Sequence, residues 1–496
     1  MTKTSDSDSL SFADDHDRLT DVNRKSIRGG AITVVSQSVS LAVHFASTII
    51  LARMLTPEDY GLVAMVASLT ALAGLFSNLG LSAASIQNHD LTDGQLTNLF
   101  WMNVGLGVIL TGIVAGLAPV VAWFYSDSRL IPITLVMSIS FLIRSFGTQH
   151  TAMLVREMQF GRNAIAAIIA AIGGFIAAVV LASYGYDYWS LIISSIVGAC
   201  LSTVALSIMS PFSPGLPSRS HDVREMVRFG VHVTATDMVN YFHRNLDNIL
   251  IGKFCGDAAL GFYTRAYSLL LFPINRIRAP INAVVYPGLC ALQDRPADVR
   301  DYFFRAMQVT ASLTIPISVF AFAFSDTIIS VTLGEQWLPA SGIFSYLAFA
   351  GVFQATIGLV ASLLNALGLV RKLFYCSLAV STFYVAAFFI GIPGGAEGVA
   401  ASYMVANLVV LIPYLYIVLP GTPVKPVDFF KAVGSPMLMS VAACLIVVFV
   451  FRTSVYRGVP LLLSEGMLFL LIYAAAMSII LAPLWIHRWT RIAPTS

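Results

Sequence analysis

Long apolar runs, separated by short polar segments, recur along the whole chain of 496 residues. A membrane-spanning helix needs about 20 consecutive, predominantly apolar residues, and fourteen runs are of that order. They lie at residues 30–52, 60–85, 98–124, 130–150, 164–184, 188–209, 229–251, 260–288, 303–330, 342–367, 373–392, 397–419, 432–451 and 461–486. The pattern predicts an all-α polytopic membrane protein with about 14 transmembrane helices.

The seventh run, residues 229–251, carries more polar side chains than a helix in lipid tolerates. A central Asp or Arg costs about 2.5 to 3.5 kcal/mol on insertion, whereas a Leu, Ile, Val or Phe returns only about 0.3 to 0.6 kcal/mol. At roughly 100° per residue, the polar residues fall within an arc of about 140°. They are Thr236, Asp237, Asn240, His243, Arg244, Asp247 and Asn248. We therefore expect this helix to face protein or a water-filled cavity.

Composition excludes most other classes of protein. The chain is 57% hydrophobic and only 11% charged, with a mean hydropathy of +0.80, whereas soluble domains carry about 25% charged residues. The five cysteines form no CxxC or Cys/His pattern, so we expect neither disulfides nor a metal site. The absence of a phosphate-binding GxxxxGK[ST] motif argues against an ATP-driven pump. A net charge of +3 is too small to indicate a nucleic-acid partner, and no cofactor is expected.

The distribution of Lys and Arg predicts the orientation. With the N-terminus inside, the tail and inner connections hold 19 of the 29 basic residues, the outer connections hold 5, and 5 lie within spans. This bias follows the positive-inside rule and favours an even number of spans. Residues 1–23 are polar and predict a disordered cytoplasmic tail.

An internal repeat divides the chain. A gapless shift of 200 residues aligns residues 24–69 with 224–269, with 8 identities over 46 positions. The polar positions recur in register, since Ser36, Gln37, Ser40, His44, Ser47 and Thr48 lie opposite Thr236, Asp237, Asn240, Arg244, Asp247 and Asn248. Six helices separate the two starts, which predicts a parallel repeat around a midplane site. The expected parts are a first lobe (24–210), a cytoplasmic linker (211–223), a second lobe (224–420) and two further helices with a C-terminal tail (421–496).

Arg244 with His243 is the strongest candidate for a substrate site. A guanidinium can grip a phosphate or carboxylate through two parallel hydrogen bonds. Asn240 lies on the same face, and His44 takes the position of Arg244 in the first copy of the repeat, where the alternative is a histidine satisfied within the bundle. The alternative is an internal ion pair of Arg244 with Asp237 or Asp247. Those two carboxylates are also candidates for carrying a coupling ion.

Further basic residues flank this face. Arg265, Arg276 and Arg278 follow on the next helix, where a cavity role is favoured for Arg276 and contact with the inner headgroups for Arg278. A basic rim at the inner mouths of both lobes would attract anionic headgroups or a phosphate-bearing substrate, although it also serves as a topology signal. Its members are Arg24, Arg28, Arg224 and Arg228.

Three motifs resemble a known family. They are ARMLTPEDYG at residues 52–61, GFYTRAY at 261–267 and GEQWLPA at 334–340. In order and spacing they are similar to colanic-acid-type lipopolysaccharide exporters, polysaccharide flippases of the multidrug/oligosaccharidyl-lipid/polysaccharide superfamily. The resemblance implies two six-helix lobes around a central cavity, two additional helices, and alternating-access export of an undecaprenyl-diphosphate-linked oligosaccharide. It also implies that Arg244, Arg265 and Arg276 meet the diphosphate.

We therefore expect a non-enzymatic flippase of the bacterial inner membrane, with both termini cytoplasmic. Its partners would be the lipid-linked oligosaccharide, membrane lipids, H⁺ or Na⁺, and the polysaccharide polymerase and chain-length machinery. A cation-coupled multidrug or small-molecule antiporter is the main alternative, although its cavity would favour unpaired acidic residues. A membrane glycosyltransferase, ligase or polymerase would need a larger outer loop than this chain offers.

Overall fold

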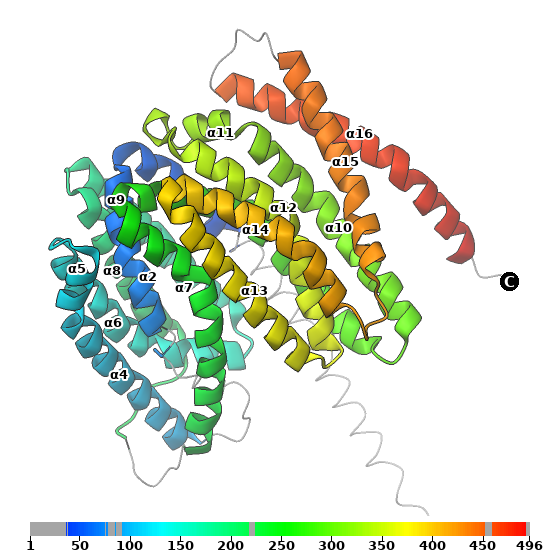
Figure 1. The fold of residues 1–496 in the computed structure, drawn as a ribbon. Helices are drawn as coiled ribbons and strands as arrows, with labels where there is room; N and C mark the ends of the chain where they lie inside the picture. Colours follow the sequence, from blue (N-terminus) through cyan, green and yellow to red (C-terminus); the bar gives the residue numbers. More distant parts are fainter. Residues whose placement is uncertain are drawn as a thin grey trace, which may run out of the picture. The chain divides into compact units, whose positions relative to one another are not determined.

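The computed structural model describes residues 36, 38–74, 76–77, 85, 92–217, 224–451 and 459–492, without the side chains of 224–244, 355, 459 and 478–492. These residues form helices and no strand. The first helix is Ser38–Met54. It is followed by α2 (Pro57–Gly74), α4 (Asp93–Gly116), α5 (Ala118–Tyr125), α6 (Leu130–Arg156), α7 (Phe160–Ser183), α8 (Asp187–Met209), α9 (Arg224–Ala291), α10 (Pro296–Ala323), α11 (Ser325–Thr332), α12 (Ala340–Ala366), α13 (Val370–Gly391), α14 (Gly395–Val418), α15 (Pro426–Phe451) and α16 (Val459–Ile492), with short 3₁₀ turns at Glu335–Trp337 and Ile392–Gly394 (Figure 1).

The predicted all-α polytopic class is confirmed, because every predicted apolar run overlaps one of these helices. By length and composition, nine helical stretches of the described residues could cross a membrane, with α13 and α14 counted as one stretch. The seventh and eighth runs form the single stretch α9, interrupted only at Gly256, where φ is 89°. This left-handed conformation is readily accessible only to glycine, so the kink depends on the missing side chain.

Two predicted runs are each broken into a long and a short helix. The run at 98–124 is divided between α4 and α5, and the run at 303–330 between α10 and α11. Pro119 sits in the first turn of α5. A proline is tolerated there because the first N–H groups of a helix lack intrahelical partners, so the apolar pattern continues while the helix restarts.

The chain divides into two compact units, Met1–Asn245 and Leu246–Ser496. In unit 1, α4 packs along α6 and α7 along α8 (Figure 1). The helices α4 and α6 approach closely at Gly107, where an added Cβ would overlap the Ser145 side chain. The division falls within α9, whereas the sequence places the lobe boundary in the linker 211–223, and that boundary stays a prediction.

Unit 2 is built around α10, which packs against α12 and α15. Fully buried apolar side chains recur every four residues along α10, at Phe303, Met307, Ala311 and Ile315. This spacing places one apolar stripe in the core. The unit also contains α16, the red helix of Figure 1, whose Tyr473 hydroxyl donates to the Ser312 carbonyl at 2.9 Å.

An ion pair joins the first turns of α10 and α15. Arg300 donates from Nε to Asp428 Oδ2 at 2.8 Å and from Nη2 to Oδ1 at 2.7 Å. The Asp428 carboxylate also accepts the backbone N–H of Lys425 at 2.9 Å. Such a two-pronged, charge-assisted contact fixes both distance and orientation, so it ties the start of the last helix pair to the bundle of unit 2.

Candidate functional site

The described residues include only part of the predicted site. Arg24 and Arg28 lie outside the described residues. Six more predicted residues lie on the α9 backbone, but their side chains are outside the description: Arg224, Arg228, Asp237, Asn240, His243 and Arg244. His44 is exposed on the helix Ser38–Met54, and its carbonyl accepts the Thr48 hydroxyl at 2.9 Å. The roles given to these residues therefore stay predictions.

Asp247 is the predicted coupling residue whose surroundings the structure describes. The residue is 7% exposed, and both of its carboxylate oxygens accept hydrogen bonds. The Tyr263 hydroxyl donates to Oδ2 at 2.9 Å, and the Asn248 backbone N–H donates to Oδ1 at 2.8 Å. Tyr263 lies 16 residues further along α9, beyond the kink at Gly256. The kink therefore lets two segments of one helical stretch pair a carboxylate with a phenol.

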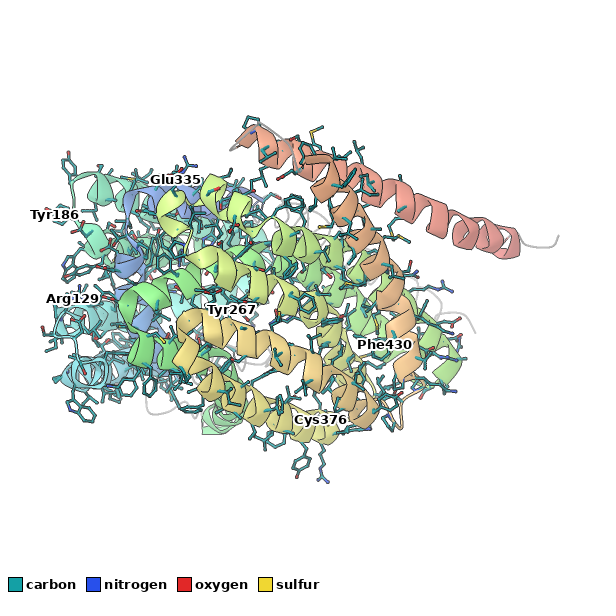
Figure 2. The ribbon with its side chains drawn as sticks, turned by 45° about the horizontal axis from the view of Figure 1, so that its top comes forward. Arg129, Tyr186, Tyr267, Glu335, Cys376 and Phe430 are labelled. Carbon is teal, nitrogen blue, oxygen red and sulfur yellow. The ribbon has the colours of Figure 1, made fainter. Side chains whose placement is uncertain are left out.

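A cluster of tyrosines extends from this pair within unit 2. Tyr267, labelled in Figure 2, stacks on Tyr263 with ring centroids 6.1 Å apart, and its hydroxyl accepts from Gln354 Nε2 on α12 at 3.4 Å. We call Asp247, Tyr263 and Tyr267 the carboxylate–tyrosine cluster. Its hydroxyl groups can donate to a carboxylate, and they can accept only from a protonated carboxyl group.

Sequence reasoning missed the tyrosines of this cluster. Tyr263 and Tyr267 are four residues apart in the motif GFYTRAY, which places them on one helix face. That spacing was the available signal. Tyrosines at helical spacing occur in many cores, however, and only the tertiary contacts identify the buried acceptor.

The arginines on the second part of α9 differ in their surroundings. Arg265 is partly buried and Arg276 is exposed. Arg278, for which the sequence favoured contact with headgroups, lies against α12, where its Nη1 would be 3.3 Å from a Cβ on Gly358. One turn further, the Ser362 hydroxyl donates to Asn282 Oδ1 at 2.6 Å. Arg278 and the Ser362–Asn282 hydrogen bond therefore lie along the same contact of α9 with α12.

Metal binding finds no support in the part of the chain that the structure describes, since no three His, Cys, Asp or Glu side chains converge there. The described cysteines are all free thiols.

Comparison with known proteins decides the family. The model of the family described as "Polysaccharide biosynthesis protein" matches residues 50–342, more than half of the chain. The chain belongs to this family. The predicted resemblance to polysaccharide exporters is thereby confirmed.

Relatives of this polysaccharide biosynthesis protein cover most of its length. The lipopolysaccharide biosynthesis protein WzxC of Escherichia coli is 23% identical over 407 residues, covering 80% of this chain and 82% of WzxC. The succinoglycan biosynthesis transport protein ExoT of Rhizobium meliloti is 23% identical over 439 residues, covering 87% and 88%.

Solved structures show the same fold. The lipid II flippase MurJ in an inward closed conformation superposes with a TM-score of 0.75 at 15% identity, covering 92% of this chain and 99% of MurJ. An inward-facing multidrug resistance MATE family transporter gives a TM-score of 0.60 at 13% identity, covering 85% and 99%. With its long apolar helices, the chain is thus a multi-pass membrane protein that shares the fold of these two proteins.

Proposed function

We propose that this protein moves an undecaprenyl-diphosphate-linked oligosaccharide from the inner to the outer leaflet of the bacterial inner membrane by alternating access. Membership of the polysaccharide biosynthesis family is the observation that carries the proposal. The names of WzxC and ExoT, which tie them to lipopolysaccharide biosynthesis and succinoglycan transport, support it. The fold shared with a lipid II flippase is consistent with a lipid-linked substrate.

Recognition of the diphosphate is assigned to basic residues on α9. Arg244, with His243 and Asn240 beside it, would grip the phosphates, joined by Arg265 and Arg276 from beyond the kink. Guanidinium groups suit this task because their planar donors match phosphate oxygens in pairs. His44 of the first helix would contribute from the other lobe, and the rim of Arg24, Arg28, Arg224 and Arg228 would attract the headgroup at the inner face.

Coupling to an ion gradient is assigned to Asp237 and Asp247. The position of Asp247 supports this part of the proposal, since a buried carboxylate is costly to keep charged and is therefore sensitive to a bound proton or cation. H⁺ and Na⁺ are both suitable ions. The polysaccharide polymerase and chain-length machinery would receive the exported unit, and both chain termini would be cytoplasmic.

A cation-coupled antiporter of small molecules is the second candidate function. The carboxylate–tyrosine cluster favours it, because an acid among aromatic rings suits a cationic, apolar substrate. The two functions differ in the sign of the substrate charge. Replacing the arginines would impair a flippase for a diphosphate lipid and leave an exporter of cations active.

The test is replacement of Arg244 by Ala and, separately, by Lys in the native host. We expect Arg244→Ala to abolish surface polysaccharide and to accumulate the lipid-linked unit on the inner leaflet. Arg244→Lys should restore export only in part, because an ammonium cannot form the paired contact. Arg129→Ala is the control, since Arg129 is an exposed residue paired with Asp127 in a connecting turn. Normal export in both Arg244 variants would contradict the role of Arg244.

A further inference from the structure

On α4 and α6 of unit 1, three polar side chains are buried without a full set of hydrogen bonds among the described residues. Asn103 on α4 and Gln149 on α6 are 0% exposed, and His150 on α6 is 4% exposed. Within the part of the chain that the structure describes, no hydrogen-bond partner is found for Asn103 Nδ2 and Oδ1, Gln149 Oε1 or His150 Nδ1. Gln149 uses only Nε2, which donates to Ser85 Oγ at 3.3 Å. Since buried polar atoms in native proteins are nearly always paired, each of these atoms requires an explanation.

The helix register brings the three residues together. Phe100 on α4 meets His150 on α6 with ring centroids 6.0 Å apart, and further along α4 Gly107 lies against Ser145. The two helices therefore run antiparallel. Asn103 lies on the same face of α4, between these two contacts, which places it within about one helical turn of Gln149 on α6.

The connection after α8 covers the His150 side of this group. Phe212 packs edge-on against the His150 ring at 5.6 Å. The connection is held on α4 by two hydrogen bonds, in which Trp101 Nε1 donates to the Gly215 carbonyl at 2.9 Å and the Gly215 N–H donates to Thr97 Oγ1 at 3.3 Å. The polar group is thus closed off by an apolar ring in this conformation.

The chemistry of the group suits a sugar. Amide and imidazole side chains offer both donors and acceptors, as a sugar hydroxyl does, whereas a diphosphate oxygen only accepts. The aromatic rings beside them provide apolar faces for the C–H groups of a pyranose. Leaving these polar atoms unpaired in an apolar interior is unfavourable, which favours their exposure to a hydrogen-bonding ligand.

We propose that Asn103, Gln149 and His150 form a sugar-binding site in unit 1 that contacts hydroxyl groups of the oligosaccharide when α4 and α6 separate during transport. This site rests on the proposed function: it would bind the glycan, while the arginines of α9 bind the diphosphate. A site built to hydrogen-bond hydroxyl groups discriminates strongly against a substrate that lacks them.

The test compares two lipid probes in nanodiscs containing the full-length protein. One probe is undecaprenyl diphosphate, and the other is the lipid-linked oligosaccharide extracted from the host's own membranes. The wild type should bind the sugar-bearing lipid more tightly. In the double variant Asn103→Leu/Gln149→Met this preference should fall about tenfold, the loss expected for two neutral hydrogen bonds. Ser140→Ala is the control, because the Ser140 hydroxyl donates within its own helix to the Met137 carbonyl.

The outcomes separate the site from the proposed function. An unchanged sugar preference in the double variant would overturn the site alone, and so would equal binding of both probes by the wild type. Binding of neither probe by the wild type would overturn the proposed function together with the site. Thermal stability provides a second readout. Asn103→Leu alone replaces two unpaired polar atoms with apolar ones of similar shape, so it should leave stability equal or higher. A lower stability of this variant would show that Asn103 is paired at rest, against the proposal.

Discussion

Replacing Tyr263 with Phe tests whether the Asp247 carboxylate is charged. The substitution removes one hydroxyl, whose 2.9 Å hydrogen bond ends on a carboxylate that is 7% exposed, while the ring and its stacking on Tyr267 remain. Both carboxylate oxygens accept hydrogen bonds, from Tyr263 and from the Asn248 backbone. A protonated carboxyl would instead donate from one oxygen. We therefore expect the carboxylate to be ionised in this conformation.

The magnitude distinguishes the two charge states. A hydrogen bond to a charged group contributes about 1.5 to 3 kcal/mol, whereas neutral side-chain hydrogen bonds within a membrane protein average about 0.6 kcal/mol. We expect a coupling energy between Tyr263 and Asp247 of about 1.5 kcal/mol or more, which corresponds to a factor of about ten in the unfolding equilibrium.

The assay is a double-mutant cycle with Tyr263→Phe, Asp247→Ala and the combined variant, each unfolded by SDS titration from mild detergent. Alanine is used because the amide oxygen of Asn could still accept the Tyr263 hydroxyl. Tyr416→Phe is the matched control, because Tyr416 is 60% exposed. A coupling energy near about 0.6 kcal/mol would refute the ionised carboxylate, and one near zero would refute the hydrogen bond itself. In reconstituted vesicles, Asp247→Asn should also remove the dependence of transport on the ion gradient.

Three other perturbations have defined outcomes. Gly107→Ala should lower the stability of unit 1 by about 1 to 3 kcal/mol, because the added methyl group overpacks the α4–α6 contact. Gly105→Ala is the control and should not lower stability, since a Cβ there meets no atom within 4 Å. Thermal unfolding of both variants measures the difference. Charge reversal at Arg300 alone or at Asp428 alone should increase proteolysis of the last two helices, and exchanging both charges should restore protection. Unchanged proteolysis of both single variants would show that the ion pair does not hold these helices in place. The hydrogen bond from the adjacent Arg129 guanidinium lowers the pKa of Asp127. The pair therefore stabilises the protein above pH about 3.9, the unfolded pKa, and this contribution is lost as the pH falls. The melting-temperature difference between wild type and Asp127→Asn should shrink on acidification, and a constant difference would contradict the assignment.

Much of the fold follows from local pattern. The apolar runs predict the helices because a segment in lipid must satisfy its backbone internally, so length and composition alone report a span. Gly256 separates two predicted runs that the structure joins in one helical stretch. The sequence could not reveal this continuity, since a single glycine is compatible with a loop and with a kink.

The candidate site was predictable only in its acidic and basic members. Asp247 is conspicuous in an apolar run, because a charge there is costly. Its partner Tyr263 is not conspicuous, since a tyrosine in a membrane helix carries no comparable cost. Asn103 and Gln149 escape notice for the same reason, being single neutral polar residues within long apolar runs.

The amino-acid sequence by itself determines the class of the protein, its helices, its expected orientation and its family motifs, because each of these depends on how a segment meets lipid or water. The tertiary structure alone decides which polar groups meet. Tyr263 reaches Asp247 across a kink, Arg300 reaches Asp428 over 128 residues, and Gln149 reaches Ser85 over 64. All these side chains lie on helices of similar composition, so periodicity assigns a face to each residue but cannot identify the residue that packs opposite it.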